Sequence, residues 1–198
     1  MYATGSGRVG FALFATSVGW CGVVWGVDGI VRVALPARPS GRDDVVGRVA
    51  TRTDLLTSHS DATETVPPAD VAAAIEGMTA LLAGEPVDLA DVRVDLGGVP
   101  EFHRRVYEVA RAIPPGSTVT YGQVAARLGM PGAAQAVGQA LGRNPVPIVI
   151  PCHRVLAAGG LGGFSAPGGA VTKQRMLRIE GALPAEPRTL FDELFAGS

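Results

Sequence analysis

The longest uncharged stretch of the chain constrains most strongly what this sequence can fold into. Residues 9–27, between Arg8 and Asp28, form a run of 19 residues without a charged side chain. That length is close to the roughly 20 apolar residues that cross a bilayer as a helix. Four glycines interrupt the run, however, and Asp28-Gly29 separates it from a second apolar run, which is the pattern of a β-hairpin. The stretch therefore predicts strands of a globular protein, and we expect no membrane partner.

The amino-terminal half has the pattern of a small α/β unit. Strands are expected over 11–16, 21–26 and 30–35, and helical spacing predicts a helix over 71–82 with Asp70 as its N-cap. The stretch from 36 to 68 is rich in Asp, Ser and Thr, and we expect residues 37–68 to be the least ordered part. Residues 87–96 alternate apolar with polar positions and fit a further strand or an extended linker.

Gly97-Gly98-Val99-Pro100 is the expected boundary to a helical half. Apolar spacing predicts a helix over 102–113. Thr120 and Gln123 have the spacing of a capping box that opens a second helix, and a Gly-containing turn leads to a third over 133–141. Two helices joined by such a turn are typical of a helix-turn-helix. The last of these helices has no charged side chain, so its backbone could lie close either to another helix or to a nucleic-acid groove.

Charge is distributed unevenly along the chain. Residues 101–178 hold nine basic and two acidic residues, a net charge of +7, although the whole chain carries −1 at pH 7. A basic segment in a near-neutral chain suggests an anionic partner, although a solvated surface would have the same composition. The two cysteines are too few for a disulfide framework or a tetrahedral zinc site, and we expect no metal and no cofactor.

Cys152 and His153 are the strongest candidates for chemistry. An apolar run ends in Pro151-Cys152-His153-Arg154, which places a thiol next to the side chain that titrates near neutral pH. A nucleophilic cysteine needs a base, and the base needs a group that orients it. Glu180, at the end of a predicted helix over 173–180, is the candidate for this group. A carboxylate at the end of a helix interacts unfavourably with the helix dipole, so its presence there suggests a specific partner. Such a relay is compatible with a protease, a glutaminase or a transferase.

The residues around this relay resemble the O6-alkylguanine-DNA alkyltransferases, also called methylated-DNA–protein-cysteine methyltransferases. The most specific motif is the stretch Asn144-Pro-x-Pro-Ile-Val-Ile-Pro-Cys152-His-Arg-Val. Further motifs follow the family's order over about 100–182: Phe102-His-Arg-Arg-Val-Tyr-Glu, Ile113-Pro-Pro-Gly-Ser-Thr-Val-Thr-Tyr121-Gly, Ala136-Val-Gly-Gln-Ala, Gly163-Phe-Ser165 and Leu177-Arg-Ile-Glu180-Gly181. The resemblance is weaker over 9–96.

The resemblance implies a fold of class α/β plus α. A ribonuclease-H-like α/β domain would occupy residues 1–96. A helical, winged-helix-like domain with the helix-turn-helix would occupy 97–185, and 186–198 would be a tail. The implied function is DNA repair by direct reversal, in which the protein flips O6-methylguanine, and possibly O4-methylthymine, out of duplex DNA. The alkyl group would be transferred to the protein's own cysteine in a single turnover. We expect a cytoplasmic monomer without an obligate protein partner.

The family's residue roles carry over onto matching positions. Cys152 would accept the alkyl group, His153 would take its proton through a water molecule, and Glu180 would orient the histidine. Tyr121 would bind the flipped base and Asn144 would brace the active-site turn. The base pocket would include Val155, Phe164 and Ser165. The residues expected at the DNA are Ala134, Gln135, Ala136, Gly138, Arg143 and Arg154.

Two departures from the family pattern leave questions open. Gln135 stands where many members have an arginine that fills the gap left by the flipped base. The loop over 161–171 is rich in glycine, so the width of the pocket does not follow from the sequence. The alternatives are a lesion sensor of the alkyltransferase-like type with impaired transfer, and a Cys-His hydrolase.

Overall fold

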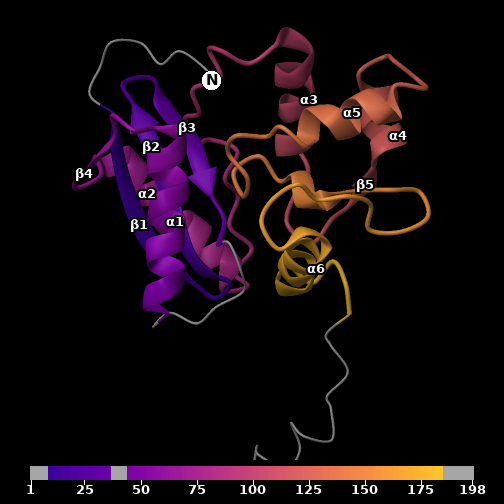
Figure 1. The fold of residues 1–198 in the computed structure, drawn as a ribbon. Coiled ribbons are helices and arrows are strands. Elements are labelled where there is room, and N and C mark those ends of the chain that lie inside the picture. The colour runs from indigo at the N-terminus through magenta and orange to yellow at the C-terminus, as the bar shows by residue number, and fades with distance from the viewer. Residues whose placement is uncertain (1–8, 37–43, 185–198) are drawn as a thin grey trace, which may run out of the picture.

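The chain folds into two halves that lie side by side, a sheet with two helices and a group of shorter helices (Figure 1). The structure is a computed structural model and describes residues 9–36 and 44–184. Residues 186–198, which the sequence suggests are a tail, lie outside the described residues. Within the described residues no helix combines the length and the hydropathy that a membrane span needs.

The first half is built on a mixed four-stranded sheet. Its strands are β1 (Gly10–Thr16), β2 (Gly19–Gly26), β3 (Gly29–Ala34) and β4 (Thr63–Glu64), in the order β3-β2-β1-β4. β1, β2 and β3 pair antiparallel through tight turns, and β4 pairs parallel with β1. The hairpins predicted from the uncharged run and from Asp28-Gly29 are thus confirmed.

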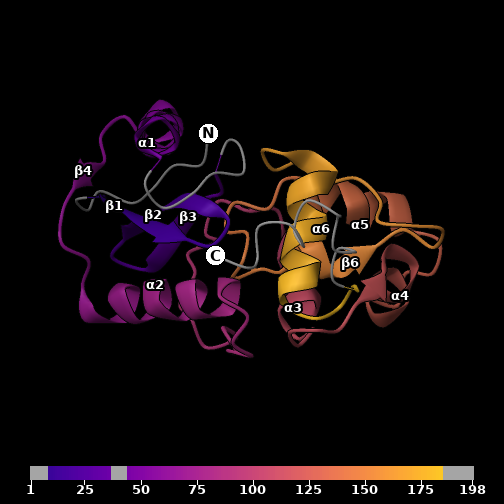
Figure 2. The same ribbon diagram turned by 90° about the horizontal axis from the view of Figure 1, so that it is seen from below.

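Helices α1 (Val45–Ser58) and α2 (Ala69–Leu82) cover opposite faces of this sheet (Figure 2). Leu55 of α1 is buried in a small core with Phe11 and Val24. It packs so closely on β2 that a Cβ at Gly22 would lie 2.4 Å from its Cδ1 atom. The other face packs on α2, and its core continues into the helical half.

Two expectations for this half need correction, and one open alternative is decided. Part of the stretch expected to be least ordered is helix α1, because Gly47, Thr51 and Leu55 recur every four residues and form its buried stripe. Asp70 lies in the first turn of α2 rather than at its N-cap, which is Pro68. Of the two alternatives for residues 87–96, the structure shows the extended linker, with a single bridge between Val94 and Ile30.

The second half consists of short helices and loops. Its helices are α3 (Glu101–Arg111), α4 (Tyr121–Arg127), α5 (Ala134–Leu141), the 3-10 turn η1 (Cys152–Arg154) and α6 (Gly169–Ile179). The capping box is confirmed, because the Thr120 hydroxyl accepts from Gln123 N and the Gln123 side chain accepts from Thr120 N. A two-stranded parallel pair, β5 (Val119–Thr120) and β6 (Val155–Leu156), joins the start of α4 to the residues after η1.

Candidate active site

The turn that presents Cys152 is held by the side chain of Asn144. Its Nδ2 atom donates to the carbonyl oxygen of Ile150 at 2.8 Å and to Cys152 Sγ at 3.2 Å. Its Oδ1 atom accepts from Val146 N at 2.9 Å. Ile148, inside the turn, has a φ of 77°, a conformation that a β-branched residue adopts only when its surroundings enforce it. Asn144 therefore fixes both the backbone of the turn and the position of the thiol.

Cys152 lies at the first position of η1 and is 8% exposed. Burial raises the pKa of its thiol, although the hydrogen bond from Asn144 and the charge of Lys173 act in the opposite direction. The thiol is therefore protonated at neutral pH and needs a base before it can act as a nucleophile. Cys21 is the other cysteine, and burial within the sheet raises the pKa of its thiol to about 12.

His153, the residue after Cys152, forms a buried hydrogen-bonded pair with Glu180. His153 Nε2 lies 2.9 Å from Glu180 Oε1, and the two side chains are 0% and 1% exposed. Burial alone would raise the pKa of Glu180, but its hydrogen bonds with His153 and Arg154 lower it to about 2. Because an ionised carboxylate only accepts hydrogen bonds, Nε2 carries the proton. Burial lowers the pKa of His153 and outweighs the opposing effect of Glu180, so the neutral ring has its acceptor at Nδ1.

Arg154 is not at the protein surface, which corrects the expectation that it contacts DNA. The residue is 5% exposed, and its guanidinium donates to both carboxylate oxygens of Glu180 at 2.9 Å and to the carbonyl oxygen of Ile113. A buried carboxylate requires such a cationic partner. Arg154 therefore neutralises Glu180 and links it to the end of α3.

A cavity of about 560 Å³ leads from the surface of α5 to Cys152. It is lined by Tyr121, Ala134, Gln135, Gly138, Gln139, Leu141, Gly142, Cys152, Gly163, Phe164 and Ser165. The cavity brings the thiol together with six of the expected residues, which are Tyr121, Ala134, Gln135, Gly138, Phe164 and Ser165. Gln139 also lines it, one turn after Gln135 on the same helix face, and sequence reasoning did not single it out.

Besides Arg154, three residues expected at the DNA or in the base pocket do not line this cavity. Val155 is fully buried and does not line this cavity. Ala136 lies on α5 outside the cavity, and Arg143 is exposed just beyond the end of that helix. The family motif points to a segment of the chain, but it does not show which way each side chain in that segment faces.

Lys173 is a further residue at the site that sequence reasoning missed. It lies on α6, is 0% exposed, and donates from Nζ to the carbonyl oxygen of Val155 at 2.7 Å. The same atom lies 5.7 Å from the centre of the Tyr121 ring and 6.0 Å from that of Phe164, within the range of cation–π attraction. Burial lowers the pKa of Lys173 to about 8, against the opposing effect of Cys152.

The remaining polar groups position the loop that closes the cavity. Ser165 Oγ donates to the carbonyl oxygen of Gly142 at 2.7 Å, which ties the loop to the end of α5. Gly162, with a φ of +71°, lies so close to Tyr121 that a Cβ would stand 3.1 Å from the ring.

Within residues 9–36 and 44–184 no group of three or more His, Cys, Asp and Glu side chains could hold a metal ion.

Comparison with known proteins identifies the family. The 6-O-methylguanine DNA methyltransferase DNA-binding domain matches residues 101–182. A methylated-DNA–protein-cysteine methyltransferase of Mycolicibacterium paratuberculosis is 42% identical over 154 residues, which cover 77% of this chain and 90% of the relative. The chain belongs to the methylated-DNA–protein-cysteine methyltransferase family. The resemblance seen in the sequence motifs is therefore confirmed.

Solved structures of the family share the fold. The O6-methylguanine methyltransferase of Mycobacterium tuberculosis is 30% identical, with a TM-score of 0.68 over 93% of this chain and 100% of that chain. The Mycobacterium tuberculosis protein OGT in complex with DNA is 30% identical, with a TM-score of 0.66 over 87% of this chain and 93% of that chain. The arrangement of a mixed sheet with helices beside a helical half is thus that of the methyltransferase family.

Proposed function

We propose that this protein repairs DNA by transferring the alkyl group of O6-methylguanine to its own Cys152. One observation carries the proposal: Cys152 lines a cavity together with residues of α5, and the next residue, His153, forms a buried pair with Glu180. The name of the matched relative, a methylated-DNA–protein-cysteine methyltransferase, describes the same donor, methylated DNA, and the same type of acceptor, a protein cysteine.

The chemistry follows from the protonation states of the site. His153 Nδ1 has no hydrogen-bond partner within the described residues, and it is the acceptor of the neutral ring. It takes the thiol proton of Cys152 through a water molecule, and Glu180 stabilises the imidazolium that forms. The thiolate then attacks the methyl carbon in line. The carbon–sulfur bond forms as the carbon–oxygen bond breaks, the bonding pair moves to guanine O6, and the base takes up one proton. No group is oxidised or reduced.

Duplex DNA is the proposed partner, and α5 is the proposed contact. Residues 101–178 carry a net charge of +7, which favours a phosphate backbone. Ala134 and Gly138 leave the surface of α5 bare, so that the helix can approach a groove closely, with Ala136 and the exposed Arg143 beside it. Gln135 fills the space of the flipped base, and Tyr121 contacts the base inside the cavity.

Several finer expectations belong to the same proposal. The two halves correspond to a ribonuclease-H-like domain over 1–96 and a winged-helix-like domain over 97–185. The protein acts as a cytoplasmic monomer, without a metal, a cofactor or an obligate protein partner. Repair of O4-methylthymine is a second substrate to be tested beside O6-methylguanine.

The test is the intact mass of the protein after incubation with a duplex that contains one O6-methylguanine. We expect a single gain of one CH₂ unit per chain, mapped to Cys152 by peptide mass spectrometry and absent from Cys152→Ala. An undamaged duplex of the same sequence is the matched control.

Two outcomes would overturn the proposal in different ways. Tight binding of the damaged duplex without a mass change would indicate a lesion sensor. Absence of both binding and transfer, together with cleavage of ester or amide substrates that depends on Cys152, would indicate a hydrolase.

A further inference from the structure

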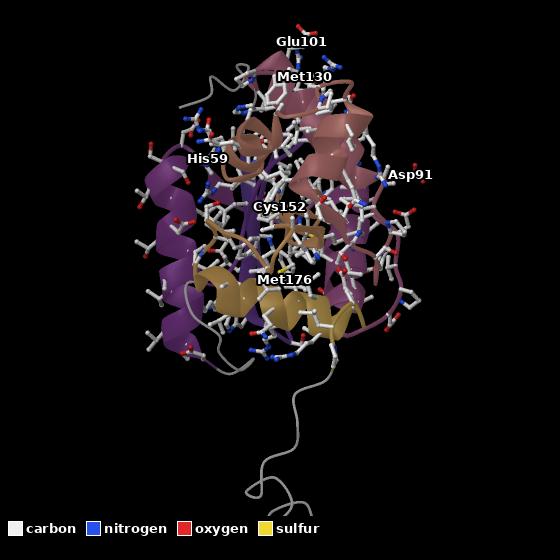
Figure 3. All side chains as sticks on the ribbon, turned by 90° about the vertical axis from the view of Figure 1, so that its right-hand side faces the viewer. His59, Asp91, Glu101, Met130, Cys152 and Met176 are labelled. Atoms are coloured by element: carbon white, nitrogen blue, oxygen red, sulfur yellow. The ribbon has the colours of Figure 1, made fainter. Side chains whose placement is uncertain are left out.

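Two glutamines of α5 form part of the wall of the cavity at Cys152. Gln135 and Gln139 are four positions apart, so they lie on one face of the helix, one turn from each other. Figure 3 views the molecule from the side of the helical half, with Cys152 near the centre and Met130, in the segment before α5, near the upper edge. The helix that carries both glutamines therefore begins at the periphery, where a large partner can reach it.

The polar side chains of this cavity wall differ in whether the protein already uses them. The hydroxyls of Tyr121 and Ser165 donate to backbone carbonyl oxygens. The side-chain amides of Gln135 and Gln139 are exposed and have no hydrogen-bond partner in the part of the chain that the structure describes. Among the described residues that line the cavity, none is charged. The wall thus offers a partner neutral amides rather than cations, which suits the edge of a base better than a phosphate.

The spacing of the two glutamines corresponds to one or two base pairs of a duplex. Four residues of an α-helix advance by about 6 Å along its axis, and neighbouring base pairs are about 3.4 Å apart. In the proposed function Gln135 fills the space of the flipped base. Gln139, one helical turn further on, then lies beside a neighbouring base pair that is still stacked.

The face of α5 that carries the glutamines suits the minor groove. Ala134 and Gly138 add almost no side chain to this face, which allows the close approach that a narrow groove requires. In the minor groove an A·T pair presents only acceptors, whereas a G·C pair adds a donor, the 2-amino group of guanine. The amide of Gln139 has an acceptor oxygen and a donor NH₂ group, so only a G·C pair can satisfy both.

We propose that Gln139 recognises the base pair next to the lesion through the minor groove and favours G·C over A·T there. The proposal rests on the proposed function, since it concerns the duplex from which Cys152 takes the alkyl group. Oε1 of Gln139 accepts a hydrogen bond from the guanine 2-amino group, and Nε2 donates to a base acceptor on the same edge. Gln139 contacts no reacting atom, and it makes repair depend on the sequence around O6-methylguanine.

The experiment changes one group of the DNA and one side chain of the protein. Duplexes with a single O6-methylguanine carry G·C, inosine·C, A·T or 2,6-diaminopurine·T at one of the two base pairs on either side of the lesion. Inosine lacks the 2-amino group of guanine, and diaminopurine adds this group to adenine, while the major-groove edge stays the same. Transfer is followed by intact mass at a series of duplex concentrations, which separates the rate constant at saturation from the half-saturating concentration.

Three variants complete the design. Gln139→Leu removes the amide and retains a side chain of similar size. Gln174→Leu is the matched control, because Gln174 lies on α6 and does not line the cavity. Gln139→Ala replaces the leucine variant if circular dichroism shows that the leucine variant does not fold.

In the unmodified protein, loss of the 2-amino group at one neighbouring pair should raise the half-saturating concentration by about two- to tenfold, the range of one hydrogen bond. Diaminopurine·T in place of A·T should lower it by a similar factor. Both effects should disappear in Gln139→Leu and persist in Gln174→Leu. Because inosine also weakens the duplex itself, the contribution of Gln139 is the difference between the unmodified protein and the variant.

Equal half-saturating concentrations for G·C and inosine·C at all four positions in the unmodified protein would overturn the proposal. An effect of the 2-amino group that persists undiminished in Gln139→Leu would also overturn it, because another residue or the duplex itself would then be the cause. Absence of transfer from O6-methylguanine in every sequence context would instead refute the proposed function itself.

Discussion

Tyr121 and Lys173 donate hydrogen bonds to the same acceptor, the carbonyl oxygen of Gly163, at 3.3 and 3.4 Å. Lys173 also holds the carbonyl oxygen of Val155, which follows the active-site turn. A lysine that is 0% exposed thus joins the loop of the cavity to the segment after Cys152. Its charge lies beneath the cavity, where it favours the thiolate over the thiol.

Replacing Lys173 by methionine should raise the pKa of the Cys152 thiol and slow transfer by about tenfold at pH 7, the effect of losing about 1.4 kcal/mol of charge stabilisation. Since burial lowers the pKa of Lys173 to about 8, the unmodified protein loses this charge as the pH rises through 8. The difference between the two proteins should therefore narrow above pH 8. The thiol pKa is measured from the pH dependence of alkylation by iodoacetamide.

Lys173→Arg is the charge-retaining control, because the guanidinium stays positively charged at every accessible pH. It should keep the pKa of the thiol below that of the methionine variant, and this difference should persist above pH 8. Identical thiol pKa values in the methionine variant and the unmodified protein would show that Lys173 acts only by packing.

Replacing Glu180 by glutamine should slow transfer by a factor on the order of 10² to 10⁴, as expected for impaired general-base catalysis. An ionised carboxylate forces the proton of His153 onto Nε2, whereas an amide can donate to Nε2 and so favour the opposite tautomer. In that tautomer Nδ1 no longer accepts a proton. Single-turnover transfer from an O6-methylguanine duplex measures the effect. An unchanged rate would show that the His153–Glu180 pair takes no part in the reaction.

Glu180 should also make the protein sensitive to acid. The pKa of its carboxyl is lowered from 4.5 to about 2 in the folded state, so its stabilising contribution is complete above pH 4.5. That contribution is lost as the pH falls from about 4.5 towards 2, because the unfolded chain takes up the proton first. The loss is on the order of 3 kcal/mol. Urea unfolding between pH 6 and about 2.5 should show it.

In the glutamine variant the free energy of unfolding should depend less on pH across the same window, although it is lower at neutral pH. Glu76→Gln, which removes an exposed carboxylate on α2, is the control and should retain the pH dependence of the unmodified protein. Equal slopes of the free energy of unfolding against pH in Glu180→Gln and Glu76→Gln would show that Glu180 does not cause this pH dependence.

Features of the fold that depend on neighbouring residues were predicted well from the sequence. Features that depend on contacts between distant residues were not. The hairpin around Asp28-Gly29 and the capping box at Thr120 depend on residues within a few positions of each other, and both are present. Helix α1 was missed because its buried stripe uses a glycine and a threonine, which do not read as apolar. Arg154 was expected at DNA because the sequence shows a charge but not its partner Glu180, 26 residues away. The burial of Lys173 has no sequence signal at all.

Gln135 provides the last prediction, on the strength and salt dependence of DNA binding. Its uncharged side chain lies at the cavity mouth on α5, so it releases no counterion from a phosphate. Gln135→Arg should tighten binding of an O6-methylguanine duplex and steepen the slope of log affinity against log salt by about one. Glu76→Gln changes the net charge equally but lies on α2, in the other half. If both variants steepen the slope by the same amount, net charge rather than contact by residue 135 governs binding, and the proposed placement of α5 against DNA is wrong.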